Sequence, residues 1–407
     1  MAASIKFSGK GQPGNLLDPN NWVGGVVPGP TSSALIDMNV GAPVTGTFSV
    51  NNLMMLAPES ITFAGTLDTA GVGVCQGLMI CEGATATFSP GAILNDGGVL
   101  IVGNDAVGAM VAQGAGTVHS VINTGSANIG KQDGGIGTFT INDAIWNNSG
   151  HAFIGDDGSG TLNVLGASKV TFSGGVDMAD EAGSHGVMTI ATGASVSVGL
   201  ALCVGEAASQ DAGTASVSVA AGASLTTGNA LEVGNGGLVT IAGGTVTGGA
   251  TASCVYMQTG GEISGYGLVT TRAGAAVDDD GTILASGGTL TVNGNVGGEG
   301  SIQIAANSSP QLTGAGLGLS GIAFIGPDAT LSLAHGVKAA ASISGFGIGD
   351  IIEMANVDAV SFNATTGNLT LSDQGLQVSV LHLAGSFAGD TFAVTQSANG
   401  AMITLHS

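Results

Sequence analysis

Acidic and amide side chains recur in the turns of this sequence, and they are the residues whose types and spacing could support chemistry. Each of these turns follows a pair of apolar residues. If the turns lie above one another in the fold, their side chains form a column along one edge. Carboxylate oxygens in a row suit Ca²⁺, which takes about six to eight oxygen ligands. The candidate calcium ligands are Asp105, Asp133, Asp156, Asp157, Asp180 and Glu181.

The same acidic turns have a second interpretation, which the sequence leaves open. Like charges in contact repel by about 1 kcal/mol at the dielectric constant of water. A charged and solvated corner nevertheless keeps a protein soluble and blocks lateral pairing of its sheets. Asp278, Asp279 and Asp280 form a second acidic cluster. A calorimetric titration with Ca²⁺ distinguishes these two interpretations, a calcium site and a solvated corner.

Groups for catalysis are sparse. Lysine and arginine total six in 407 residues, and Arg272 is the single arginine. Polysaccharide hydrolysis or elimination needs paired carboxylates at a set separation, or carboxylates with a metal and a basic residue. No nucleophile elbow is present, so we expect a protein that is not an enzyme. The histidines have no metal-ligand spacing and are expected at exposed corners or loops; they are His119, His151, His185, His335, His382 and His406.

The four cysteines are too few and too scattered for a disulfide scaffold. Cys203 and Cys254 are expected to point outward from their strands, about 10 Å apart at the strand stacking distance, which is too far for a disulfide. Cys75 and Cys81 are either a local pair or unpaired structural thiols.

The composition limits the partners. Glycine accounts for 73 residues and charged residues for 8%, while hydrophobic residues reach 44%, so the chain has enough apolar groups to fold. The formal charge of −22 repels nucleic acid and anionic membranes and suits cations or basic partners. The sequence has no apolar run of about 18 residues or more, so we expect no membrane-spanning helix. Met1–Gly14 lacks the apolar core of a secretory signal, which leaves a removed signal and an uncleaved export route both open.

A pair of apolar residues separated by one residue recurs along the chain, usually followed by glycine and a polar turn. Successive pairs are 22 to 29 residues apart, and such a period indicates a repeat architecture. The pairs are Leu53/Met55, Leu78/Ile80, Leu100/Val102, Ala127/Ile129, Ala152/Ile154, Val176/Met178, Leu202/Val204, Leu231/Val233 and Val255/Met257.

Two more alternating segments follow each pair in phase. One begins Gly-Thr, as in Gly137–Ile141, and the other begins Gly-Ala, as in Gly166–Thr171. Period-two alternation between Gly, Asn and Asp turns indicates short strands. Three strands per period leave no room for crossover helices. We therefore expect an all-β parallel β-helix, a β-solenoid with about 25 residues per coil and about 4.8 Å between coils; a β-sandwich, the alternative, has no fixed three-strand phase.

These motifs resemble a known group of proteins. Residues 154–246, with FIGDDGSGTLNVLGASKV and LEVGNGGLVTIAGGTV, resemble the passenger repeats of bacterial autotransporters and related secreted adhesins. Asn21–Pro30 is similar to their opening coil. Gly345–Glu353 and Leu383–Val394 are similar to the C-terminal part of secreted solenoid proteins. The resemblance does not include a translocator barrel or calcium-binding nonapeptides. It implies a β-solenoid at the cell surface or outside the cell.

The expected organisation has three parts. Residues 1–50 are irregular and proline-containing, and they predict an N-terminal cap or docking segment. Residues 51–340 predict the β-solenoid. Residues 341–407 lose the repeat phase, and they predict a small C-terminal β module that caps the solenoid and could carry a secretion or assembly signal.

These observations favour an extracellular structural protein without enzymatic activity. It would assemble with itself, head-to-tail or laterally, into a fibre, a surface layer or a biofilm matrix, because an uncapped solenoid end is a template for another chain. Extracellular polysaccharide is a further expected partner. A monomeric adhesin that binds glycans or host surfaces is the first alternative. A polysaccharide-active enzyme is the second. Electron microscopy of the purified protein separates filaments from single molecules.

Overall fold

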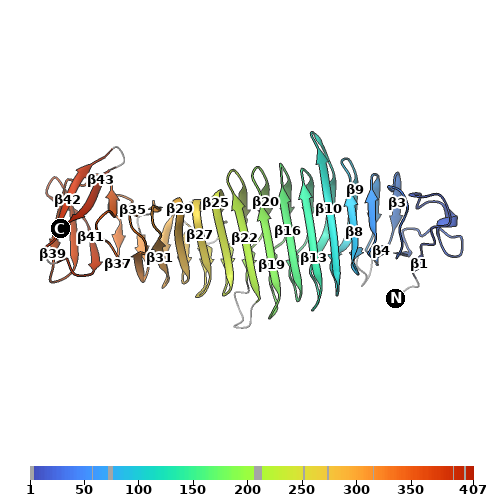
Figure 1. Cartoon of the computed structure of the whole chain (residues 1–407), viewed down its shortest axis with the longest axis horizontal. Coiled ribbons are helices and arrows are strands. Elements are labelled where there is room, and N and C mark those ends of the chain that lie inside the picture. Colours follow the sequence, from blue (N-terminus) through green and yellow to red (C-terminus); the bar gives the residue numbers. More distant parts are fainter. Residues whose placement is uncertain are drawn as a thin grey trace. The chain divides into compact units, whose positions relative to one another are not determined.

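The chain is almost entirely β-structure. The computed structural model describes residues 4–56, 58–71, 77–205, 213–250, 253–272, 275–314, 316–387, 389–397 and 400–407. It divides into two compact units, the first formed by residues 1–218 and 222–227 and the second by residues 219–221 and 228–407. In both units, short strands stack in parallel from coil to coil (Figure 1). The predicted parallel β-solenoid is therefore confirmed.

The first unit has three parallel sheets. Sheet 1 contains the recurring apolar pairs and consists of β1 (Ile5–Lys6), β2 (Ser33–Ile36), β4 (Asn52–Met55), β7 (Leu78–Ile80), the ends of β9 (Ile93–Val102) and β12 (Val121–Ile129), β15 (Ala152–Ile154), β18 (Val176–Met178) and β21 (Leu202–Val204). Sheet 2 consists of β5 (Ser60–Phe63), β8 (Ala84–Phe88), β10 (Val107–Ala115), β13 (Ile136–Asn142), β16 (Ser159–Leu165), β19 (His185–Ile190) and β22 (Thr214–Ala220).

Sheet 3 of the first unit completes each coil. It consists of β3 (Thr47–Val50), β6 (Thr66–Thr69), the beginnings of β9 and β12, β14 (Ile145–Asn148), β17 (Lys169–Phe172), β20 (Ser195–Val198) and β23 (Ser224–Thr227). The strands β9 and β12 bend through the corner between sheets 3 and 1, with a register irregularity at Thr124/Ser126. The short β11 (Val118–His119) pairs antiparallel with β10.

The second unit repeats this arrangement. Its parallel strands are β24 (Leu231–Val233), β25 (Gly237–Thr247), β26 (Ser253–Met257), β27 (Glu262–Thr270), β28 (Ala276–Asp279), β29 (Thr282–Asn293), β30 (Asn295–Gly297), β31 (Ser301–Ile304), β32 (Ser309–Leu312), β33 (Gly316–Gly318), β34 (Gly321–Phe324), β35 (Thr330–Leu333), β36 (Lys338–Ala339), β37 (Ser342–Ser344) and β38 (Ile351–Met354). Strands with antiparallel pairing follow: β39 (Ala359–Asn363), β40 (Asn368–Asp373), β41 (Leu376–Ala384), β42 (Thr391–Gln396) and β43 (Ala401–His406). Of these, β41 also pairs in parallel with β37.

The recurring apolar pairs lie in the core, on sheet 1 in the first unit and on β24 and β26 in the second. All nine predicted pairs are buried, and consecutive pairs are in register, as for Ile129 with Ile154 and Ile154 with Met178. Alternate residues of a strand point to opposite faces, so an apolar residue at every second position fills the interior of each coil. Aromatic rings contact one another there: the ring centroid of Trp146 lies 4.8 Å from Phe139 and 4.9 Å from Phe172.

A left-handed backbone residue ends most strands of sheet 1. Gly130, at φ +72°, follows the pair of β12, and a Cβ there would lie 2.2 Å from the carbonyl oxygen of Ser159. Both the dihedral angle and the close approach therefore favour glycine. Ala179 takes the same place after β18 at φ +56°, so the turn geometry is kept even where a side chain makes it costly.

The two ends of the described chain do not repeat the coil. At the N-terminus, Trp22 stacks on Phe48 at 5.8 Å and contacts Phe7 edge-on at 5.4 Å, and its Nε1–H donates to the carbonyl of Leu16. At the C-terminus, β38 pairs antiparallel with β43 and β41 pairs antiparallel with β40. The predicted boundaries at residues 50 and 340 stay a prediction. Within the described residues, no helix is long and apolar enough to cross a membrane.

The structure corrects the prediction that Cys254 points outward. Its side chain is fully buried. The register between β26 and β28 shifts between Ser253 and Val255, and this irregularity changes the alternation that the sequence implied. Cys203 is half-buried, and Cys81 is a free, buried thiol. Cys75 lies outside the described residues.

Candidate functional site

The acidic turns of the first unit do stack on one another. The backbone N–H of Asp156 donates to the carbonyl of Gly130 (3.0 Å), and that of Glu181 donates to the carbonyl of Asp156 (3.1 Å). The Asp156–Asp157 turn therefore lies between the Lys131–Gln132 turn and the Asp180–Glu181 turn.

Neutral and basic side chains interrupt this acidic column. The N–H of Gln132 donates to the carbonyl of Asn104 (2.7 Å), so Gln132 lies beside Asp105 in the stack. The turn that contains Asp133 is longer than the turn of the next coil. Backbone pairing between the two turns resumes only where the N–H of Ser159 donates to the carbonyl of Gly135 (2.8 Å). The N–H of Asp157 donates to the carbonyl of Lys131 (3.1 Å), so Gln132 lies between Asp105 and Asp157 in the stack.

The carboxyl of Asp156 is subject to opposing influences from its burial and from its neighbours in the column. Burial raises its pKa, whereas the Lys131 ammonium and a hydrogen bond from Asn128 lower it. Among the described residues, no group of three or more His, Cys, Asp or Glu side chains is arranged to hold a metal. Calcium binding at the predicted residues stays a prediction, and its test is a calorimetric titration with Ca²⁺.

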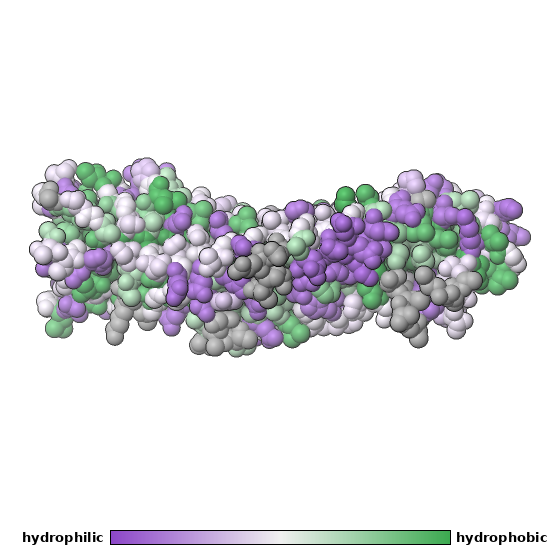
Figure 2. Space-filling model, turned by 90° about the horizontal axis from the view of Figure 1, so that it is seen from below, coloured by the Kyte–Doolittle hydropathy of each residue, from purple (hydrophilic) through white to green (hydrophobic). Residues whose placement is uncertain are grey.

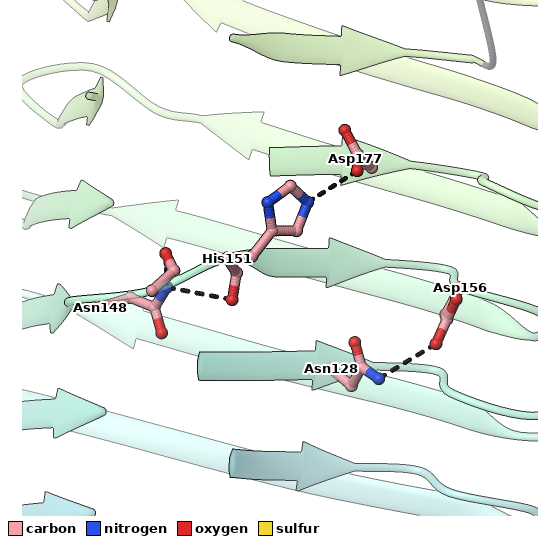
Figure 3. A network of polar contacts seen from close by, with 6 residues as sticks. Asn128, Asn148, His151, Asp156 and Asp177 are labelled. Carbon is pink, nitrogen blue, oxygen red and sulfur yellow. Dashed lines mark hydrogen bonds and ion pairs between the residues drawn. The ribbon is translucent and has the colours of Figure 1, made fainter. Parts of the chain in front are cut away.

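A polar network joins neighbouring coils on the outer side of sheet 1 (Figure 3). Asn128 Nδ2 donates to Asp156 Oδ2 at 3.0 Å, and His151 Nε2 lies 2.6 Å from Asp177 Oδ2. The His151 and Asp177 side chains are 41% and 26% exposed, so their attraction is screened and contributes about 0–1 kcal/mol. His151 and His119 are half-buried rather than exposed, whereas the other four histidines lie at the surface as predicted.

A ladder of amide side chains follows sheet 3 of the first unit. Asn147 Nδ2 donates to Asn123 Oδ1, Asn123 Nδ2 donates to Asn95 Oδ1, and Asn95 Nδ2 donates to Asp68 Oδ1, each at 2.9 Å. Ser49 donates to the other carboxylate oxygen of Asp68 at 3.0 Å. The ladder forms because these residues occupy the same register position on β3, β6, β9, β12 and β14 and point outward.

A second row of polar side chains lies beneath the ladder and is buried. Thr69 Oγ1 donates to Asp96 Oδ1 (2.9 Å), and Thr124 Oγ1 donates to Asn148 Oδ1 (2.7 Å). The indole Nε1–H of Trp146 donates to Thr124 Oγ1 (3.0 Å). The bond to Trp146 ties this row to the aromatic core, and the row gives the corner beneath the ladder a hydrogen-bonded support.

A groove opens along these two rows, at the corner between sheets 3 and 1. Its volume is about 460 Å³. Glycines at the corner let the backbones of neighbouring coils approach closely: a Cβ on Gly125 would lie 2.5 Å from the carbonyl oxygen of Gly98, and a Cβ on Gly150 would lie 2.4 Å from that of Gly125. The lining residues are Asn95, Asp96, Gly97, Asn123, Thr124, Gly125, Asn147, Asn148, Ser149, Thr171 and Ser173. We call this the asparagine groove.

The asparagine groove is lined by amides, hydroxyls and one carboxyl. Burial raises the pKa of Asp96, and hydrogen bonds from Gly98, Thr69 and Leu78 lower it. Its carboxyl is 3% exposed and accepts all three bonds. The arrangement therefore offers a ligand hydrogen-bond donors and acceptors rather than a free acid or base.

This groove was not predicted from the sequence, although the sequence carries a signal for it. Asn95, Asn123 and Asn147 recur 28 and 24 residues apart, within the range of steps that the apolar pairs show. Asparagine is common in turns, so a recurring asparagine does not by itself indicate a groove. On the face that Figure 2 shows, hydrophilic residues form a continuous area on the first unit, beside apolar areas nearer its N-terminus.

Comparisons with known proteins identify no family. No protein-family profile matches the chain, and no curated protein matches it. Among solved structures, the chain is similar to a crystal structure of a TibC-catalysed, hyper-glycosylated TibA fragment, at 18% identity over 76% of this chain and 91% of that one, with a TM-score of 0.27. A similarity at that TM-score carries no argument, so the predicted relation to secreted adhesins stays a prediction. The strand pairing itself assigns the fold: a parallel β-solenoid.

Proposed function

We propose that this protein is a non-enzymatic extracellular binding module that holds glycans in the asparagine groove of its first unit. The observation that carries the proposal is the row of Asn95, Asn123 and Asn147 amides along an open, polar groove. A side-chain amide has two N–H donors and a carbonyl with two lone pairs. Each ladder bond uses one N–H and one lone pair, which leaves donor and acceptor capacity for the hydroxyl groups of a sugar.

The rigidity of the groove also supports binding. The ladder amides bond to their neighbours, and the buried row fixes the corner beneath them. Side chains that are already ordered lose little conformational entropy when a ligand binds, and such preorganisation raises affinity. A ladder on flexible loops would lose that advantage.

The chemistry of the lining argues against catalysis in the groove. Asp96 is its one titratable side chain, and the hydrogen bonds to that carboxyl occupy both of its oxygens. Glycoside hydrolysis commonly needs two carboxyl groups about 5–10 Å apart on either side of the scissile bond. The groove offers polar contacts without that pair.

Self-assembly into a fibre, surface layer or biofilm matrix is the other prediction from the sequence. The aromatic cap around Trp22 and the antiparallel strands after β38 end the coil repeat on both sides of the described chain. A covered end is a poor template for another copy, and for this reason we favour the binding module. Negative-stain images of the purified protein test assembly directly: filaments would support the structural role.

The binding test compares two alanine variants on a glycan array and by calorimetry. Asn123→Ala removes the central amide of the ladder and both of its ladder bonds. Asn163→Ala is the matched control, since Asn163 is a half-buried asparagine on the outer side of sheet 2 whose Nδ2 donates to Thr140 at 3.4 Å. We expect Asn123→Ala to weaken glycan binding by about tenfold or more, which is about 1.4 kcal/mol, and the control to bind as the parent does. Absence of binding to every glycan, or equal binding by both variants, would contradict the proposal.

A further inference from the structure

We infer that the asparagine groove selects a neutral, extended polysaccharide that lies along the stacking direction of the coils. This inference rests on the proposed glycan-binding function of the same groove. It adds the charge of the ligand, its direction on the protein and the length of chain that the groove can hold.

The direction follows from how the groove is lined. Each of the consecutive strands β9, β12, β14 and β17, with the turn after it, contributes two or three residues to the lining. The groove therefore runs from coil to coil rather than along one strand. Three strand spacings of about 4.8 Å give a length of about 14 Å between the first and last strand. A ligand that contacts Asn95, Asn123, Asn147 and Thr171 together must be an extended chain.

The side chains at the groove favour a ligand without charge. None of the lining residues is basic. Asp68 ends the ladder on one side, and Asp96 lies in the buried row. A uronic acid or a sulfated sugar would bring its negative charge toward these carboxyls, within a chain of net charge −22.

One lysine, Lys169, lies near the groove. Lys169 is two residues before Thr171 on β17, so both side chains point to the same face of the strand, about 6.6 Å apart. Lys169 is exposed and lies outside the lining. On the neighbouring strand its register partner is Ile145. A single ammonium on one strand does not match a polymer with a charge on every repeat.

The ladder bonds predict how the groove responds to a charge. Every ladder amide donates toward the preceding coil, so Asn123 must donate to Asn95 and accept from Asn147. Asn123→Asp keeps the shape of the side chain but replaces the donor with an acceptor, and it adds a negative charge inside the groove. Asn163→Asp makes the same chemical change on sheet 2, outside the groove.

The experiment measures binding of the full chain to soluble polysaccharides by calorimetry at low and high salt. The neutral probes are mannan, dextran and cello-oligosaccharides of increasing length, and the anionic probes are alginate and polygalacturonate. We expect binding to at least one neutral probe, little change with salt, and an affinity that rises with oligosaccharide length until the chain exceeds about 14 Å, the length of three strand spacings. Asn123→Asp should weaken that binding by about tenfold or more, and Asn163→Asp should leave it unchanged.

The outcomes separate this inference from the function on which it rests. Preferential binding of alginate or polygalacturonate, weakened by salt and by Asn123→Asp, would overturn the inference and leave glycan binding in place. If a neutral monosaccharide bound as tightly as the longer oligosaccharides, the inference that the ligand is an extended chain would be wrong. Binding to none of the polysaccharides would overturn both the inference and the proposed function.

Discussion

The carboxyl of Asp279 on β28 lies in the core of the second unit, where the preceding strands β24 and β26 carry apolar residues. It pairs in register with Met257 of the preceding coil and is 0% exposed. Its Oδ1 accepts a hydrogen bond from the N–H of Gly281 at 2.9 Å. Its Oδ2 is buried and has no hydrogen-bond partner among the described residues. We therefore predict that replacing this carboxyl with an amide, Asp279→Asn, changes how stability depends on pH.

The size of the expected loss of stability follows from the pKa of the Asp279 carboxyl. Burial raises the pKa of Asp279 from 3.8 to about 7, against the Gly281 hydrogen bond, which lowers it; the charges of Asp280 and Asp278 raise it further. The unfolded chain releases this proton near pH 4, whereas the folded chain holds it until about pH 7. The parent protein should therefore lose stability across that interval and lose no more above it. At about 1.4 kcal/mol per pH unit, the loss is about 4 kcal/mol.

Native-state hydrogen exchange, corrected for the intrinsic effect of pH on exchange, is the suitable assay. A repeat protein opens locally, so a global melting curve would average over many coils. The amide of Asp280 donates to the Met257 carbonyl, and the amide of Gly300 donates to the Asp279 carbonyl. Peptides that contain these amides report on the coil itself. Relative to Asp279→Asn, their protection in the parent should fall by about three powers of ten between pH 4 and pH 8.

A second variant controls for the loss of one negative charge. Asp328→Asn removes an exposed carboxylate from the same unit at a residue with φ +56°, and asparagine tolerates that conformation. It should keep the pH dependence of the parent. The amide of the Asp279→Asn variant also adds an unpaired donor, whose cost does not depend on pH, so only the change with pH is compared. Identical pH profiles for the parent and Asp279→Asn would refute the reasoning.

Two further predictions concern the corner beneath the asparagine groove. Trp146→Phe removes the buried hydrogen bond to Thr124 and leaves part of the indole volume empty, and we expect urea denaturation of the first unit to show a loss of about 1–3 kcal/mol. Gly125→Ala places a Cβ about 2.5 Å from the carbonyl oxygen of Gly98 and should cost about 1–3 kcal/mol by overpacking. Gly29→Ala, where a Cβ meets nothing within 4 Å, should change stability by less than about 0.5 kcal/mol; equal effects of the two alanines would contradict the packing argument.

The acidic residues show where reasoning from sequence alone reached its limit. The sequence correctly indicated that the turns after the apolar pairs stack, because that follows from a constant repeat. From the sequence, Asp278, Asp279 and Asp280 were expected to form one acidic cluster. The structure places the middle carboxyl in the core instead, because alternation along β28 turns every second side chain inward and the register with β26 fixes which one.

The asparagine ladder required more than the repeat. The spacing of Asn95, Asn123 and Asn147 is visible in the sequence. Whether their amides meet depends on the register between β9, β12 and β14 and on the bend of those strands at the corner. The burial of Cys254 could not be predicted from the repeat either. A local irregularity in β26 buries this side chain, which simple alternation would expose.

The sequence by itself determined the architecture of this protein. A repeat with an apolar residue at every second position has one economical way to bury them, and that way is a coil whose strands stack on their own equivalents. Only the tertiary structure decided which polar residues meet. A shift of one residue in register moves a side chain from the core to the surface, so the buried carboxyl of Asp279 and the groove beside Asn123 depend on register and corner geometry that no repeat pattern specifies.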